Sequence, residues 1–370
     1  MVDIKTVALI GYTIPLILAQ MPFLILKLLI RRAWLGSELS LSSDFGRTLI
    51  RELRGIPISF IRFIGSPELM PDLAKSKRYG PIAQDTYRPT SAPGFEGWWH
   101  IQGPPGDRTA AKECDKVIYF IHGGAYVIGN SRTSLVQHLR MAEVCAKKKV
   151  KLAIFALRYP LAPEATWPAP IEAAVAGYRW LVEHEGIDPR NIIPYGESAG
   201  GHLVVALLYD IARQKLPKPG HAVLMFPWLN LHNRSTSFDR NKYLDILGRP
   251  SLDYAALAVL PESLRDKYKN VLDFSRPSDG HSLKEILPDK TWVSVGAHDQ
   301  FVDDIVRWTE IARKDGAKVD LEVVPGFAHG GTIARDVFKT TSFLALEPDQ
   351  DAEGVMPGAE YMASGVLSIL

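Results

Sequence analysis

Short apolar segments alternate with helical stretches through the second half of this 370-residue chain. Six segments have the length and composition of buried strands, at residues 117–121, 152–157, 191–195, 222–226, 292–295 and 319–324. Helical periodicity lies between them, at 134–149, 170–186, 199–213 and 302–315. Parallel strands need such crossover connections, so the pattern predicts the α/β class, with a mostly parallel central sheet covered by helices on both faces.

Two regions interrupt this alternation. Residues 36–99 are irregular and rich in proline, with short helical stretches predicted at 40–54 and 56–64. Residues 232–285 are polar, and only 251–259 has a helical pattern. We interpret both regions as additions to the α/β unit.

The composition excludes several classes of protein. Hydrophobic residues make up 46% and charged residues 23%, which is typical of a globular enzyme and excludes a disordered chain. A net charge of +2 gives no basic surplus, so we expect no nucleic-acid partner. The two cysteines cannot build a disulfide framework. We also predict no metal and no cofactor, because no histidine–carboxylate spacing or glycine-rich nucleotide loop is present.

The N-terminus carries the longest apolar stretch. Residues 7–26 contain no charged residue, and 20 helical residues span about 30 Å, the thickness of a bilayer core. We therefore predict a membrane anchor within residues 1–35 and a folded domain over 36–370. Two alternatives stay open: a cleaved signal peptide, and an apolar segment that lies on the membrane surface or beside the pocket of the domain.

The side of the membrane is not decided by the sequence. Lys27, Arg31 and Arg32 follow the apolar stretch, which favours a cytosolic domain by the positive-inside rule. The glycosylation motif Asn233-Arg234-Ser235 would instead fit a lumenal domain.

A pentapeptide of the pattern G-x-S-x-G, residues 196–200, follows a predicted strand and opens a predicted helix. A serine on such a sharp turn needs small neighbours, which Gly196 and Gly200 provide. Ser198 is then exposed near the positive end of the following helix and is a candidate nucleophile. The alternative interpretation is an ordinary glycine-rich helix start.

Residues 122–126, His-Gly-Gly-Ala-Tyr, follow another predicted strand. Acyl transfer places negative charge on a carbonyl oxygen, and preorganised N–H donors stabilise that charge. We predict that the backbone N–H groups of Gly123, Gly124 and Ala199 form this oxyanion hole. Taken alone, the two glycines would indicate only a turn, and we expect His122 to brace the loop.

A base and an acid for Ser198 are predicted from two later strand ends. Asp299 follows the strand at 292–295, and His329 follows the strand at 319–324. Both would reach the sheet edge that carries Ser198, so we predict a Ser198–His329–Asp299 triad. Asp303 and Asp304 are rivals for Asp299, but a helix over 302–315 would carry them away.

Together these motifs resemble the hormone-sensitive-lipase-like branch of the α/β-hydrolases, which includes arylacetamide deacetylases and fungal steryl acetyl hydrolases. Residues 158–164 (RYPLAPE) and 226–231 (FPWLNL) also resemble family segments. The resemblance implies the α/β-hydrolase fold, with a helical cap from about 36–100 and 232–285, and an anchored enzyme of the endoplasmic reticulum. Pro160 and His202 depart from the family pattern, which leaves the substrate open.

The resemblance implies a serine carboxylesterase or deacetylase that works through an acyl-enzyme. With an anchor, we expect a small lipophilic ester as substrate, with a short acyl group such as acetyl on a lipophilic alcohol. Tyr126 and Trp228 are the predicted lining of its apolar pocket. Alternatives are an acyltransferase or cyclase with the same triad, a ligand receptor on the same fold, and a tethered scaffold protein.

Overall fold

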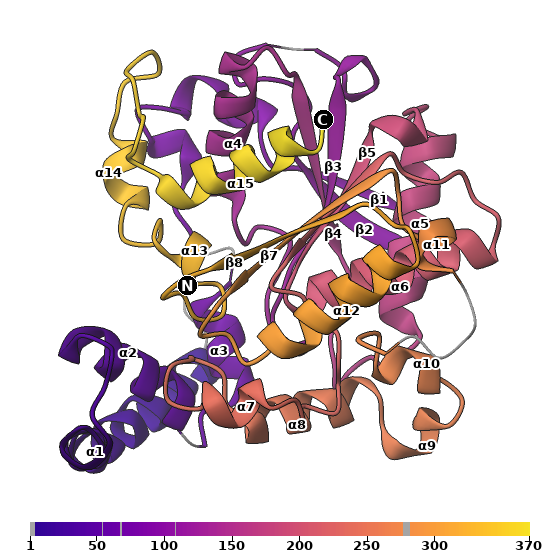
Figure 1. Ribbon diagram of the computed structural model, residues 1–370. Helices are drawn as coiled ribbons and strands as arrows, with labels where there is room; N and C mark the ends of the chain where they lie inside the picture. The colour runs from indigo at the N-terminus through magenta and orange to yellow at the C-terminus, as the bar shows by residue number, and fades with distance from the viewer. Residues whose placement is uncertain (1–3, 54, 67–68, 108, 277–281) are drawn as a thin grey trace.

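The computed structural model describes residues 4–53, 55–66, 69–107, 109–276 and 282–370, and its centre is one twisted sheet of eight strands (Figure 1). The order of the strands is β1-β2-β4-β3-β5-β6-β7-β8, and all neighbours from β4 to β8 are parallel. The parallel strands are β3 (Lys116–Ile121), β4 (Leu152–Arg158), β5 (Ile192–Glu197), β6 (His221–Met225), β7 (Lys290–Gly296) and β8 (Val319–Val324). The predicted α/β fold class is confirmed.

The crossover helices cover both faces of this sheet, as the alternation predicts. They are α4 (Leu135–Lys147), α5 (Ala169–Glu183), α6 (Ala199–Arg213) and α12 (Val302–Lys314). The strands between them are apolar on both sides: every residue of β3 from Val117 onward is fully buried. A strand that is buried on both faces has no polar side to alternate with, which is why its sequence is a continuous apolar run.

An antiparallel hairpin extends the sheet at one edge. It consists of β1 (Arg88–Ala92) and β2 (Phe95–Ile101), and β2 pairs with β4. The cap predicted over 36–100 therefore extends too far, because residues 88–101 belong to the sheet. Proline, serine and glycine interrupt the alternation there, yet Gly97 is needed: a Cβ atom at this position would lie 2.2 Å from the ring of Phe155.

Two groups of helices cover one end of the sheet (Figure 1). The insertion between β6 and β7 contributes α7 (Ser237–Arg240), α8 (Arg249–Val259), α9 (Glu262–Arg265) and α10 (Lys269–Leu272). The last helix of the insertion, α11 (Leu283–Ile286), lies instead beside α6. The N-terminal region contributes α1 (Ile4–Leu35), α2 (Leu41–Glu52) and α3 (Ile58–Ile64). Figure 1 shows α1 and α2 beside α7, so segments far apart in the sequence form one layer.

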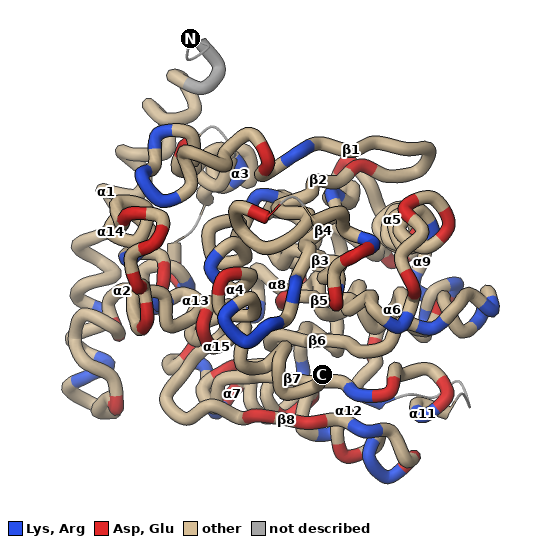
Figure 2. The backbone as a smooth tube through the Cα atoms, turned by 90° about the horizontal axis from the view of Figure 1, so that it is seen from above, with Lys and Arg blue, Asp and Glu red and all other residues tan. Residues whose placement is uncertain are grey.

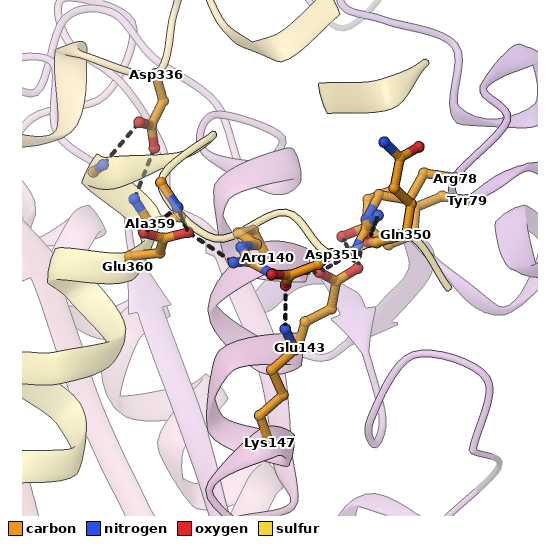
Figure 3. Close-up of polar contacts among 12 residues, drawn as sticks. Arg78, Tyr79, Arg140, Glu143, Lys147, Asp336, Gln350, Asp351, Ala359 and Glu360 are labelled. Atoms are coloured by element: carbon orange, nitrogen blue, oxygen red, sulfur yellow. Dashed lines mark hydrogen bonds and ion pairs between the residues drawn. The ribbon is translucent and has the colours of Figure 1, made fainter. Parts of the chain in front are cut away.

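The C-terminal helix α15 (Pro357–Ser368), which no sequence pattern predicted, packs on α4. Figure 3 shows the polar contacts that hold it. Asp336 accepts the N–H groups of Gly358 and Ala359 at 2.8 and 2.7 Å, in the first turn of α15. Arg140 of α4 pairs with Glu360 at 2.7 Å. A carboxylate at a helix N-terminus satisfies amides that lack helical partners, so this end of the helix is fixed.

Candidate active site

Ser198 sits in the sharp turn between β5 and α6. Its backbone has φ 53° and ψ −117°, a conformation that L-residues rarely adopt. The turn is this tight because the chain closes on itself: a Cβ atom at Gly196 would lie 2.3 Å from the carbonyl oxygen of Gly200, and one at Gly200 would lie 2.0 Å from that of Ile121. Only glycine fits at both positions, and the serine side chain is left partly exposed.

Two loops from other strand ends bring an imidazole and a carboxylate to this serine. The Ser198 hydroxyl lies 2.9 Å from His329 Nε2, and His329 Nδ1 lies 2.8 Å from Asp299 Oδ2. Asp299 is fully buried, and its Oδ1 accepts the N–H of Phe301 at 2.8 Å. The arrangement can pass one proton from the hydroxyl to the imidazole while the carboxylate fixes the tautomer of the ring.

The rival carboxylates lie elsewhere. Asp303 pairs with Arg240 at 2.6 Å, and Asp304 pairs with Arg307 at 2.8 Å. Both are on α12, which turns away from the loop that holds Asp299.

The surroundings of His329 favour its protonated form. Burial lowers the pKa of the imidazole, but the charge and the hydrogen bond of Asp299 raise it. The charge of Asp245 raises this pKa further, and the net direction is upward. A base of this kind accepts the serine proton readily, provided that the imidazole is neutral before the reaction.

The loops beside Ser198 carry three backbone N–H groups that are candidates for binding an oxyanion. In the described part of the chain, no hydrogen bond occupies the amides of Gly123, Gly124 or Ala199. Gly123 lies against the nucleophile, since a Cβ atom there would be 3.2 Å from Ser198 Cβ. Gly124 has φ +108°, and its Cβ would lie 2.2 Å from the carbonyl oxygen of Ile128. Unoccupied amides beside a candidate nucleophile can stabilise an oxyanion.

His122 braces the same loop. Its Nδ1 lies 2.7 Å from the carbonyl oxygen of Gly123, and its ring stacks on Tyr159 at 4.3 Å between centroids. Tyr159 in turn donates its hydroxyl to the carbonyl oxygen of His122.

Comparison with known proteins decides the family. A family profile described as the alpha/beta hydrolase fold matches residues 118–332, which include all these loops. This chain belongs to the α/β-hydrolase family. An acetyl-hydrolase of Streptomyces hygroscopicus is 30% identical to this hydrolase over 63% of the chain and 78% of the relative. A protein of Schizosaccharomyces pombe that is named for steryl acetyl hydrolysis is 25% identical, over 73% of the chain and 74% of the relative.

Solved structures agree on the fold. An esterase from the bacterial hormone-sensitive lipase family superposes with a TM-score of 0.59 at 24% identity, and the match covers 93% of this chain and 98% of that structure. The α/β-hydrolase fold that the motifs predict is thereby confirmed. The named relatives are esterases and ester hydrolases, so this α/β-hydrolase is an enzyme of the carboxylic-ester hydrolase class.

Tyr126 and Trp228, the predicted pocket residues of this hydrolase, are both fully buried. The Tyr126 hydroxyl lies 2.7 Å from His202 Nδ1, and Trp228 Nε1 donates to Asn233 Oδ1 at 2.8 Å. The structure therefore does not place either side chain at the wall of an open cavity. Both side chains pack behind the loops of the site. His202, which departs from the family pattern, is the hydrogen-bond partner of Tyr126.

The sequence did not indicate Asp245, a buried carboxylate behind the triad. Its Oδ1 accepts the N–H groups of His329 and Ile246 at 3.0 and 2.7 Å, and its Oδ2 accepts the N–H of Gln300 at 2.7 Å. One side chain thus joins the loop of the base to the loop of the acid. Burial and the charge of Asp299 raise the pKa of Asp245.

Glu197 of this α/β-hydrolase, directly before the nucleophile, is a second buried carboxyl group. Burial raises its pKa to about 8, so it holds its proton near neutral pH. Only its deprotonated form would raise the pKa of His329. A glutamate within G-x-S-x-G could have been noted from the sequence, but only burial reveals its protonation.

Proposed function

We propose that this α/β-hydrolase is a serine carboxylesterase that removes short acyl groups, such as acetyl, from a lipophilic alcohol, with Ser198, His329 and Asp299 as the catalytic residues. The hydrogen-bonded series from Ser198 through His329 to Asp299, at 2.9 and 2.8 Å, is the observation that carries this proposal. It has the order and the lengths that nucleophilic catalysis needs.

The reaction follows from this geometry. Ser198 Oγ attacks the carbonyl carbon while its proton moves to His329 Nε2. The amides of Gly123, Gly124 and Ala199 bind the negative carbonyl oxygen. As the tetrahedral intermediate collapses, the alcohol takes the proton from His329 and leaves, and the acyl group stays on Ser198. Water then repeats the cycle with His329 as base and releases the acid.

Two observations support a short acyl group on a lipophilic alcohol. The relatives include an acetyl-hydrolase, an enzyme named for ethyl acetate and one named for steryl acetyl esters, all with small acyl groups in their names. The long apolar helix α1 would keep the enzyme where lipophilic alcohols accumulate.

We further propose that α1 attaches the enzyme to a membrane, in a eukaryotic cell that of the endoplasmic reticulum. From Val7 to Leu35 the helix is long and apolar enough to cross a membrane, a property that signal sequences share. The ion pairs between α1 and α2 make α1 part of the folded protein, which supports a retained attachment segment over a signal sequence that is removed. The glycosylation motif carries no weight for the side of the membrane, because Asn233 is fully buried and bonded to Trp228 and Asp253.

A fluorophosphonate probe and p-nitrophenyl esters test the catalytic proposal. We expect wild type to be labelled and Ser198→Ala to be unlabelled and inactive, while the exposed-site control Ser342→Ala behaves as wild type. We also expect kcat/KM to fall from acetate to octanoate ester. Equal labelling of Ser198→Ala would contradict the assignment of the nucleophile. A rise with chain length would contradict the acyl preference alone.

A further inference from the structure

One face of α1 is packed against the folded domain along almost its whole length. The buried or half-buried positions recur with helical spacing, at Leu9, Ile10, Thr13, Leu16, Ile17, Gln20, Met21, Leu24, Leu28, Arg31 and Arg32. They span 23 intervals of 1.5 Å, about 35 Å of helix. The helix contacts α2 and α3, and Leu16 lies beside Gly55 in the loop between them. A bilayer-spanning helix would carry α2 and α3 into the lipid with it.

Ion pairs hold the second half of α1 on α2. Asp44, which is fully buried, accepts hydrogen bonds from both Arg31 and Arg32, and Lys27 pairs with Glu52 at 2.7 Å. The positive charges that follow the apolar stretch are therefore directed at the protein. They are not free to fix the orientation of a spanning helix by contact with lipid phosphates.

The other side of α2 and α3 reaches the active site. On α2, Arg47 donates to the carbonyl oxygens of Leu244 and Gly326, and Arg51 donates to that of Asp245 at 2.8 Å. These carbonyls lie beside the loop of His329.

On α3, Arg62 donates to the carbonyl oxygen of Val127 at 2.8 Å, behind the oxyanion loop. The two short helices thus contact the two loops that flank Ser198, with α1 packed across them.

Exposed apolar side chains are found on all three helices of this layer. Along α1 the exposed residues include Tyr12, Leu18, Phe23, Leu26 and Ile30, and neighbouring elements add Ile50 of α2 and Ile64 of α3, each more than half exposed. Only 17% of the apolar window of α1 is buried. In Figures 1 and 2, α1 runs along one edge of the molecule, and its apolar stretch carries no charge. Monomeric soluble proteins rarely leave such a patch uncovered.

We propose that α1, α2 and α3 form a monotopic docking face, with α1 lying in the plane of one leaflet. The partner is the headgroup–acyl boundary of a bilayer. This inference rests on the membrane attachment proposed above and concerns its geometry. It accounts for a helix of 32 residues, about 48 Å long, that is packed sideways on the domain.

Depth measurements on the full-length protein in phosphatidylcholine–phosphatidylserine (4:1) vesicles test this geometry. A fluorophore on Tyr12→Cys, Leu18→Cys or Ile25→Cys is quenched by lipids that are spin-labelled at different acyl positions. Cys114 and Cys145 are buried and should not react. An in-plane helix gives one shallow depth for all three sites, and Ser364→Cys on α15 remains unquenched.

Two other outcomes would contradict the in-plane geometry. For a spanning helix, Tyr12 and Ile25 would differ in depth by about 20 Å, which overturns the in-plane geometry but keeps the attachment. Absence of quenching at all three sites overturns the attachment as well. Neither result touches the Ser198→Ala test of the esterase activity.

A second measurement uses the flanking helices. We expect Ile50→Asp or Ile64→Asp to weaken vesicle binding by about tenfold, with unchanged hydrolysis of soluble p-nitrophenyl acetate. Leu370→Asp, at the far end of the molecule in Figure 1, is the matched control and should bind as wild type. Unchanged binding of both variants would overturn the proposed face.

Discussion

The sheet with its catalytic loops and the α1–α3 layer are held together by different forces. Strands β3, β4 and β5 are buried on both sides, and the turn at Ser198 leaves no room for a single added carbon at Gly196 or Gly200. The α1–α3 layer keeps much of its apolar surface exposed and is joined to the domain by arginine side chains. Close packing fixes atoms to fractions of an ångström, whereas long charged side chains permit adjustment.

This difference separates the candidate catalytic residues at the sheet edge from the α1–α3 layer around them. The proposed nucleophile, base and oxyanion donors must be held rigidly, and the sheet edge does so. On the membrane proposed above, the α1–α3 layer would have to tolerate a changing lipid environment without disturbing them. Substitutions in the first region should therefore change the rate by orders of magnitude, and substitutions in the second should change it by small factors.

The largest effect should come from the base. We expect His329→Gln to lower kcat by about 10⁴–10⁶-fold, because no other group can take the proton of Ser198. Stopped-flow measurement of p-nitrophenol release would show no acylation burst. The control is His298→Gln, a neighbouring histidine that lies 3.7 Å from Glu38 and outside the proton path. Equal losses in the two variants would contradict the contrast between the rigid site and its surroundings.

The oxyanion loop should come next. We expect Gly123→Ala to lower kcat by about 10²–10³-fold, since the new methyl group would lie 2.9 Å from the carbonyl oxygen of Glu197 and displace the amide. Gly46→Ala in α2 is the matched control, because a Cβ atom there meets nothing within 4 Å. Steady-state kinetics on p-nitrophenyl acetate distinguish the two. A normal kcat for Gly123→Ala would remove that amide from the oxyanion hole.

Asp245 should give an intermediate effect and a shift with pH. We expect Asp245→Asn to lower kcat about 10- to 100-fold, because the amide group cannot accept both the His329 and the Gln300 N–H. The acid limb of kcat/KM should also move. In wild type, activity is lost as pH falls through the raised pKa of His329, so the limb lies above pH 6.5.

Removal of the Asp245 charge lowers the pKa of His329, so the limb of Asp245→Asn should lie at lower pH. A lower kcat with an unmoved limb would mean that Asp245 acts through loop geometry alone. Asp253→Asn, in the insertion, serves as a control for the loss of a carboxylate nearby.

The smallest effect should appear in the α1–α3 layer. We expect Arg47→Gln to lower the free energy of unfolding by about 1 kcal/mol, since it loses hydrogen bonds to two backbone carbonyls. Hydrolysis should change by less than about threefold. Lys27→Gln removes only an exposed ion pair and should change stability by less than about 0.5 kcal/mol. Thermal unfolding in detergent and esterase rates measure both.

Most residues of the candidate site, at the edge of the sheet, could be predicted from the sequence. The loops of Ser198, Asp299 and His329 each follow a strand with a strong apolar pattern, so their meeting could be inferred from topology. Asp245 lies 84 residues before His329 in a polar insertion without periodicity, and nothing local marks it as a partner of the triad. Only the folded chain brings such a residue to the site.

The other differences between the sequence predictions and the structure have local causes. The hairpin β1–β2 contains proline, glycine and serine, and strand propensity is weak where tertiary pairing decides. Tyr126 and Trp228 are aromatic residues beside sequence motifs, and we therefore predicted that they line the substrate pocket. An aromatic residue type alone does not distinguish a side chain that lines a pocket from one that is packed behind it. The apolar length of α1 was evident, whereas its sideways packing depends on α2 and α3.

The packing of α1 also has a practical consequence for expression. Removal of residues 1–35 to obtain a soluble protein would delete both guanidinium partners of Asp44 and the ammonium partner of Glu52. It would also uncover the sides of α2 and α3 that α1 covers, opposite the sides from which Arg47, Arg51 and Arg62 reach the loops of the candidate site. A truncated enzyme would thus leave the helices beside its candidate active site without support on one side, and purification of the intact chain in mild detergent is the better route to a native sample.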